Sequence, residues 1–153
     1  MKIGVLSDTH GWLDPQIKTR FAGVDHIVHA GDVGDAFIAF ELEQMAPLTV
    51  VLGNTDLGLT FPLTAVVELA GRKLLVQHIV NPLAPDEKLA ARLAREKPDM
   101  VIFGHTHRRF CETHHGSLFF NPGYAGKPKL GTERWAALLH SEPGGWRPEF
   151  LAL

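Results

Sequence analysis

The sequence predicts an α/β fold with mixed sheets, and two observations carry this prediction. In the first half of the chain, short apolar runs alternate with longer segments of helical pattern, which is typical of βαβ units. From Phe61 onward the apolar runs come in pairs, which indicates hairpins. The composition agrees, because 45% hydrophobic and 21% charged residues are ordinary for a globular protein. At 153 residues, we expect one domain spanning residues 1–153.

Three buried strands are expected in the first half, and each runs into a polar cluster rich in Gly, Asp or Asn. The strands are residues 3–6, 26–29 and 49–52. Buried parallel strands read as continuous apolar runs, and polar loops follow them. Residues 36–45 are predicted to form a helix that has Asp35 as its N-cap and ends before Pro47. Its apolar face is expected to hold Phe37, Phe40, Leu42 and Met45.

The second half predicts two hairpins, one long helix and two closing strands. The first hairpin pairs residues 64–69 with residues 73–78. The helix covers residues 85–97, because Pro85 suits a first turn, acidic residues follow it, and Pro98 stops the helix. An apolar strand at residues 100–103 ends in another polar cluster. The remaining strands are expected at residues 109–113, 117–121, 135–139 and 149–153.

Charge and hydropathy exclude several classes of partner. The 15 Lys and Arg residues against 17 Asp and Glu leave a formal net charge of −2, so no strong field draws the chain to nucleic acid or anionic lipid. No segment approaches the roughly 18 apolar residues of a membrane span. Asp8 interrupts the N-terminal apolar run, which argues against a signal peptide, and the single Cys111 suits a reducing compartment. We therefore expect a cytoplasmic protein with neither a nucleic-acid polymer nor a membrane as partner.

Residues of metal-ligand type follow the strands at five places. They are Asp8, His10, Asp32, Asn54, His78, His105 and His107. Loops at the carboxyl ends of the strands of an α/β sheet meet in one crevice, so residues far apart in sequence can converge there. Asp8 and His10 are two residues apart, as are His105 and His107, and in extended backbone such pairs point the same way. Each pair is therefore expected to reach one common site.

This set of residues predicts a hydrolytic metal centre. Carboxylate oxygen, imidazole nitrogen and one amide oxygen, without a thiolate, suit Mn, Fe, Zn, Co or Ni. Seven donors exceed what one ion takes, so we expect two divalent ions with Asp32 as the bridging ligand. A water held between the ions would lose its proton near neutral pH and attack phosphorus, which is phosphoester hydrolysis. Asp56 is expected to support the ligands from outside rather than bind metal.

Four motifs, in this order, resemble those of the calcineurin-like metallophosphoesterase superfamily. They are Asp8-x-His10, Gly31-Asp32, Gly53-Asn54-x-Asp56 and Gly104-His105-x-His107. The short length and Asn121-Pro122-Gly123 are most similar to the small bacterial and archaeal phosphodiesterases of that superfamily. The resemblance implies a four-layer α/β/β/α sandwich with a dinuclear site on its edge. Manganese is the favoured metal, ahead of Ni, Fe, Co and Zn.

The resemblance also implies a role for each ligand. By position, the first metal would be held by Asp8, His10, Asp32 and His107. The second would be held by Asp32, Asn54, His78 and His105. Asp32, Asn54 and His105 are expected to be catalytic, with Asn54 also facing the substrate phosphate.

Two positions depart from the family pattern. Thr55 stands where many members carry a histidine that is proposed to protonate the leaving oxygen, so no general acid is evident. Ile79 follows His78 where a glycine is usual, and we expect it to narrow the pocket or to reposition His78. The first departure predicts faster turnover of esters whose leaving group needs no proton.

The sequence is therefore interpreted as a metal-dependent phosphodiesterase that hydrolyses a small phosphate ester. A phosphomonoesterase on the same site is one alternative, which differs only in access for the leaving group. A catalytically weak scaffold resembling the small retromer subunit is the other, and the full set of seven competent ligands favours the enzyme. Cyclic nucleotides, dinucleotides and phospholipid-type diesters stay open as substrates, and a homo-oligomer is compatible with the sequence.

Overall fold

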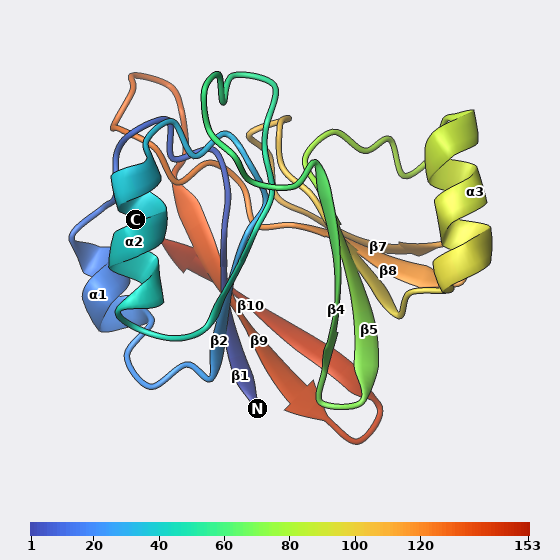
Figure 1. Cartoon of the computed structure of the whole chain (residues 1–153). Helices are drawn as coiled ribbons and strands as arrows, with labels where there is room; N and C mark the ends of the chain where they lie inside the picture. Colours follow the sequence, from blue (N-terminus) through green and yellow to red (C-terminus); the bar gives the residue numbers. More distant parts are fainter.

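The computed structural model describes all 153 residues and contains two five-stranded mixed sheets that pack face to face (Figure 1). The first sheet has the strand order β10-β9-β1-β2-β3. Its strands are β1 (Lys2–Leu6), β2 (His26–His29), β3 (Leu48–Val50), β9 (Trp135–Glu142) and β10 (Gly145–Ala152). β1, β2 and β3 are parallel, β9 pairs antiparallel with β1, and β10 pairs antiparallel with β9.

The second sheet has the strand order β4-β5-β6-β8-β7. Its strands are β4 (Thr64–Leu69), β5 (Arg72–Gln77), β6 (Met100–Ile102), β7 (Phe110–His114) and β8 (Ser117–Asn121). The three central strands are parallel, and the hairpin partners β4 and β7 form antiparallel edges. The mixed sheet predicted for the second half is therefore present.

Helices cover the outer face of each sheet. α1 (Gln16–Arg20) and α2 (Ala36–Glu43) pack on the first sheet, and α3 (Glu87–Glu96) packs on the second, at opposite sides of Figure 1. Strand alternation divides the core accordingly: Ile3 and Val5 of β1 point between the sheets, whereas Leu6 packs with the helices. The layers run α/β/β/α, as the resemblance implies.

Several element boundaries differ from the prediction. The sequence pattern does not reveal α1, because this helix has five residues and one buried side chain, Ile17. α3 begins at Glu87, since Asp86 is extended and its carboxylate accepts the N–H of Leu89 at 2.8 Å. Pro85 therefore precedes the helix instead of lying in its first turn. β9 and β10 are eight residues each, longer than predicted, because they pair with each other along their whole length.

The buried face of α2 also differs from the prediction. Ile38, Ala39 and Leu42 are buried, whereas Phe37 and Phe40 are 60% and 54% exposed and stack on each other. Because α2 is apolar nearly all round, its periodicity does not identify the buried side. The predicted N-cap is confirmed: the Asp35 carboxylate accepts the N–H of Phe37 at 2.9 Å.

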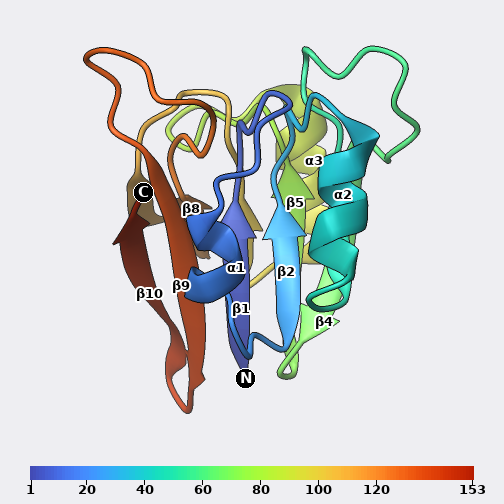
Figure 2. The ribbon, with the colours of Figure 1, turned by 90° about the vertical axis from the view of Figure 1, so that its left-hand side faces the viewer.

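The parallel strands of both sheets end at the same edge of the molecule. In Figure 2 the arrowheads of β1, β2 and β5 all point to the top, where the connecting loops gather. The loop after β1 stays paired with the loop after β2, since the N–H of Asp8 donates to the Gly31 carbonyl and that of His10 to the Asp32 carbonyl. The polar clusters identified in the sequence lie in these loops. No helix is long and apolar enough to cross a membrane.

Candidate metal centre

Most of the predicted ligands have an unusual backbone conformation. Five of the seven adopt left-handed φ values: Asp8 (59°), His10 (47°), Asp32 (52°), His105 (68°) and His107 (58°). The extended backbone assumed for the two pairs spaced two apart is therefore wrong, although each pair does reach the common edge. A left-handed non-glycine residue costs of order 1–3 kcal/mol, and such residues gather at functional sites.

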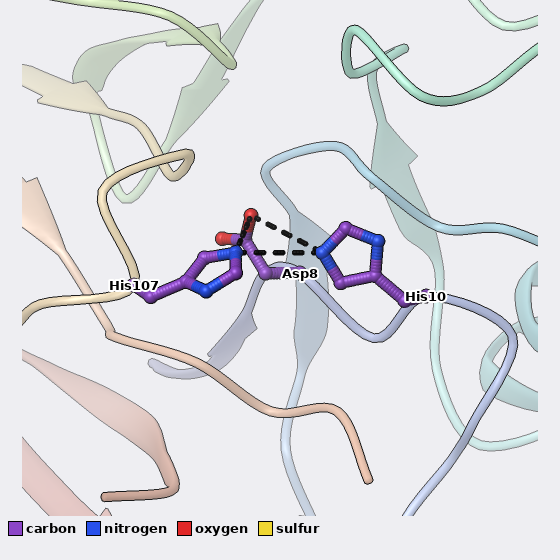
Figure 3. A group of neighbouring side chains, drawn as sticks. All are labelled: Asp8, His10 and His107. Carbon is purple, nitrogen blue, oxygen red and sulfur yellow. Dashed lines mark hydrogen bonds and ion pairs between the residues drawn. The ribbon is translucent and has the colours of Figure 1, made fainter. Parts of the chain in front are cut away.

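One group of ligands comprises Asp8, His10 and His107, whose side chains converge in Figure 3. The Nε2 atom of His107 lies 3.3 Å from Asp8 Oδ1 and 3.4 Å from the Nε2 atom of His10. The Nε2 atom of His10 lies 4.0 Å from the same Asp8 oxygen. Three potential donor atoms thus surround one point, as a metal ion requires.

A second group comprises Asp8, Asp32 and His78, all buried. The Nε2 atom of His78 lies 3.4 Å from Asp32 Oδ2 and 3.9 Å from Asp8 Oδ1. Asp32 Oδ2 is also 3.7 Å from the Nε2 atom of His10, so it faces both groups. This position suits the bridging role predicted for Asp32, and Asp8 belongs to both groups as well.

Asn54 and His105 lie beside the second group. The Nδ1 atom of His105 is 2.9 Å from Asn54 Oδ1, and its ring centroid is 5.4 Å from that of His78. The backbone N–H of His105 donates to Asp8 Oδ2 at 3.2 Å. All seven residues singled out from the sequence are therefore together at one edge.

Two buried acceptor atoms test whether the site fits a metal. The Nδ1 atom of His78 lies 2.7 Å from the Ala30 carbonyl oxygen, which can only accept, so Nδ1 carries the proton and Nε2 has a free lone pair. His78 Nε2 and Asp8 Oδ1 are buried and have no hydrogen-bond partner. An unpaired buried acceptor is costly, and divalent cations held by the two groups would satisfy these atoms. The donors therefore fit divalent metal ions.

Two glycines allow the ligand loops to approach each other closely. A Cβ atom on Gly53 would overlap the carboxylate and the backbone nitrogen of Asp32. A Cβ atom on Gly104 would overlap the side chain of Ser7 and lie 2.7 Å from Asp8 Oδ2. The Gly-Asn and Gly-His motifs thus have a steric cause that the ligand chemistry alone does not reveal.

Asp56 joins two of the loops. Its carboxylate accepts the backbone N–H groups of Val33 at 3.0 Å, Gly34 at 2.7 Å and Gly53 at 2.8 Å. These contacts fix the loop after β2 against the loop after β3. Asp56 lies outside both ligand groups, and its hydrogen bonds go to backbone N–H groups, so the support that it gives the metal ligands comes through the backbone.

The backbone N–H of Thr55 orients Asp32, because it donates to Asp32 Oδ1 at 2.9 Å and leaves Oδ2 directed at the ligand groups. Burial raises the pKa of Asp32, but the Thr55 hydrogen bonds and the nearby His78 and His10 outweigh it and hold this pKa below its ordinary value. Tyr124 is buried against the imidazoles, with its ring centroid 4.7 Å from that of His107. The sequence singles out Thr55 only for the histidine that it replaces, and the ligand motifs reveal neither its backbone contact with Asp32 nor the packing of Tyr124.

His29 supports the same loops from the core. It is fully buried, and its Nδ1 accepts the N–H of Gly31 at 3.2 Å, so the neutral ring has its proton on Nε2. That Nε2 donates to Thr9 Oγ1 at 2.9 Å, and Thr9 in turn donates to the Val33 carbonyl at 2.9 Å. The chain of hydrogen bonds therefore fixes the loops that carry Asp8 and Asp32.

We expect His29 to make the stability of the metal-free protein depend on pH. Burial lowers the pKa of His29 from 6.5 to about 4, although nearby carboxylates oppose this shift. The unfolded state binds a proton below pH 6.5 and the folded state only near pH 4, so stability falls as the pH falls between them. The shift corresponds to about 3 kcal/mol. Urea unfolding measured from pH 7 to pH 4 should show a smaller loss of unfolding free energy in His29→Gln than in the control His140→Gln. An equal dependence of stability on pH in the two variants would contradict this role.

These features define a class: an α/β/β/α protein with Asp, His and Asn donors gathered at the carboxyl edge of its strands. A family model described as the calcineurin-like phosphoesterase superfamily domain matches residues 1–144, and the chain belongs to this superfamily. The resemblance seen in the motifs is therefore confirmed. Members of this family use divalent metals, and the Asp and His groups above are able to bind them.

Two relatives come from Methanocaldococcus jannaschii. A probable metallophosphoesterase is 35% identical over 136 residues, which covers 84% of this chain and 70% of that protein. A protein named phosphodiesterase is 29% identical over 140 residues, which covers 80% of this chain and 83% of that protein. The family is thus supported by relatives that span most of both chains.

Solved structures agree on the fold. A predicted phosphoesterase from Streptococcus pneumoniae superposes with a TM-score of 0.77 at 26% identity, covering 99% of this chain and 88% of that one. Vps29 from Chaetomium thermophilum superposes with a TM-score of 0.77 at 18% identity, covering 100% of this chain and 95% of that one. At that identity, the second likeness shows a shared fold alone.

Proposed function

We propose that this protein is a metal-dependent phosphodiesterase that hydrolyses a small phosphate ester. The observation that carries the proposal is the pair of buried acceptors, His78 Nε2 and Asp8 Oδ1, which face each other 3.9 Å apart without a hydrogen-bond partner. Two divalent ions, when bound, would activate a water for attack on phosphorus and neutralise charge on the phosphoryl oxygens. We favour manganese over Ni, Fe, Co and Zn, because carboxylate and amide oxygens accompany the imidazoles.

The chain's own residues have separate roles in this proposal. Asp8, His10, Asp32 and His107 would hold one ion, and Asp32, Asn54, His78 and His105 the other. Asp32 is the residue whose charge serves both ions, because its Oδ2 faces both His10 and His78. Asn54 is exposed, and with its Oδ1 beside His105 its amide nitrogen is free to donate to a phosphoryl oxygen.

The diester preference is supported by a relative that is named phosphodiesterase and covers 80% of this chain. Thr55 offers a hydroxyl 3.5 Å from His10 Nδ1 at the position of the family's histidine, and this bears on the leaving group. The near-neutral charge favours a small substrate over a nucleic-acid polymer. The exposed, unpaired Cys111 suits the cytoplasm as the place of action.

The leaving group should control the rate. Because Thr55 replaces the histidine that would protonate the leaving oxygen, esters of an acidic phenol should react at least about 10²-fold faster than alkyl esters of the same phosphate. The measurement uses 4-nitrophenyl methyl phosphate, which can lose either nitrophenolate or methanol, and compares kcat/KM for the two reactions. Thr55→His should lower the ratio of nitrophenolate loss to methanol loss by accelerating the loss of methanol. Equal rates of the two reactions in the wild type would contradict the absence of a general acid.

The test of the function itself is hydrolysis of bis(4-nitrophenyl) phosphate by metal-stripped protein. Activity should return with Mn²⁺, and a series with Ni²⁺, Co²⁺, Zn²⁺ and Mg²⁺ ranks the competing ions. A 4-nitrophenyl monoester run in parallel distinguishes a diesterase from a monoesterase. Folded protein that stays inactive with every ion would instead favour the non-catalytic scaffold.

A further inference from the structure

A cavity of about 460 Å³ opens beside the second ligand group. Asn54 and His78 line it, so it is continuous with the candidate metal centre. Its other walls come from the segment after β3, the start of β4, the end of β5 and the beginning of α3. In Figure 1 the connection from β5 to α3 runs across the upper right of the molecule. The volume lies within the roughly 300–1,000 Å³ of small-ligand sites.

Part of the wall is apolar and exposed. Leu63 is 73% exposed and Ile79 is 51% exposed, and both line the cavity. His78 nevertheless keeps its place in the second group, so the isoleucine shapes the cavity and leaves the ligand in reach of Asp32. An apolar portion of a ligand would cover both side chains and gain from their burial.

The same wall holds a cation that forms no direct ion pair. Arg92 of α3 donates from Nη1 to Thr64 Oγ1 and, at 3.2 Å, to Gln77 Oε1, both neutral acceptors. It forms no ion pair, whereas Arg95 on the same helix pairs with Glu96 at 2.8 Å. A half-buried guanidinium is held in place here, with its remaining N–H groups unused.

The balance of charge in the cavity favours an anion. Lys88 also lines it and forms no ion pair. The one carboxylate in the wall, Asp86, is already occupied as the N-cap of α3, where it accepts the N–H of Leu89 at 2.8 Å. Two cations without ion pairs, Arg92 and Lys88, therefore share the cavity with one carboxylate that already caps a helix. Guanidinium groups bind carboxylate and phosphate oxygens through paired N–H donors.

We propose that this cavity binds the part of the phosphate ester that extends beyond the phosphoryl group, and that Arg92 recognises a second anionic group there. The substrate class is a phosphate ester whose substituent has an apolar portion followed by a carboxylate or a further phosphate. This inference rests on the proposed function for the placement of the phosphoryl group. Arg92 is a specificity-determining residue in it, because it binds the substituent and stays away from the reacting atoms.

The test compares two inert ligands of the manganese-loaded protein, phenylphosphonate and 4-carboxyphenylphosphonate, by calorimetry. The wild type should bind the carboxylated ligand about tenfold more tightly, the gain expected from one charge-assisted contact. Arg92→Gln should lose this preference and still bind phenylphosphonate, while Arg92→Lys, which keeps the charge, should retain part of it. Arg95→Gln, on the same helix and outside the cavity, should behave like the wild type. Thermal unfolding of each variant confirms that the fold is retained.

Equal affinity for the two ligands, failure to bind either, or a preference that survives Arg92→Gln would overturn the inference. Two diesters with one leaving group separate this result from the function: 4-nitrophenyl phenyl phosphate and its 4-carboxyphenyl counterpart. The inference predicts a lower KM for the carboxylated diester, with kcat unchanged, and loss of that difference in Arg92→Gln. Hydrolysis of both at equal KM contradicts the inference alone. If neither diester is hydrolysed while the protein still prefers the carboxylated phosphonate, the proposed phosphodiesterase activity is contradicted and the anion site at Arg92 is retained.

Discussion

Asp32→Asn should reduce hydrolysis of bis(4-nitrophenyl) phosphate by about 10³-fold or more. Asp32 Oδ2 faces His10 at 3.7 Å and His78 at 3.4 Å, so its negative charge is placed to serve both ligand groups. Asparagine keeps the size and one oxygen but removes the charge. A loss of about 4 kcal/mol of transition-state stabilisation corresponds to that factor. Steady-state kinetics with saturating Mn²⁺ measure the effect.

The matched control for this prediction is Asp35→Asn. It makes the same chemical change three residues further along the chain, at the N-cap of α2, where asparagine caps as well as aspartate. The control should keep both stability and activity. If Asp32→Asn kept a tenth of the wild-type activity, the assignment of this residue to both ions would be wrong.

Gly53→Ala should lower both stability and metal binding. The added methyl group would overlap the carboxylate and the backbone nitrogen of Asp32, and the backbone cannot give way as a flexible side chain does. Overpacking of this kind costs about 3 kcal/mol, or about 10 °C in the unfolding temperature of a domain of this size. Differential scanning calorimetry and Mn²⁺ titration measure the two effects.

Gly144→Ala controls for the substitution itself. Gly144 lies between β9 and β10, and a Cβ atom there meets nothing within 4 Å. This variant should unfold within a few degrees of the wild type. Equal unfolding temperatures for both variants would mean that the loop after β3 moves freely away from Asp32, contrary to the close approach described above.

The ligands were predictable because they are polar residues at the ends of apolar strands. Asp8, Asp32 and His105 each come shortly after a buried strand, and the topology of an α/β sheet brings such positions to one edge. The sequence therefore predicts which residues meet. It does not predict how they meet, because the left-handed backbone at Asp8 and His10 depends on hydrogen bonds to a loop more than twenty residues away.

The supporting residues were less predictable for a related reason. His29 bonds to the Thr9 side chain, and Asp56 accepts the backbone N–H groups of Val33 and Gly34. These partners are twenty or more residues away in the chain, and no short motif encodes such contacts. In α2 the error has a different cause: an almost wholly apolar helix gives no periodic signal, so the sequence pattern places Phe37 on the wrong face. Patterns in sequence report local periodicity, whereas these features arise from the packing of distant segments.

The most direct test of the central claim is the number of metal ions that the protein binds. Metal-stripped wild-type protein titrated with Mn²⁺ by calorimetry, with metal content checked by elemental analysis after gel filtration, should bind two ions per chain. Asp32→Asn should bind at most one, and Asp35→Asn should bind two. A single ion in the wild type, or two ions held with unchanged affinity by Asp32→Asn, would contradict a dinuclear centre built on Asp32.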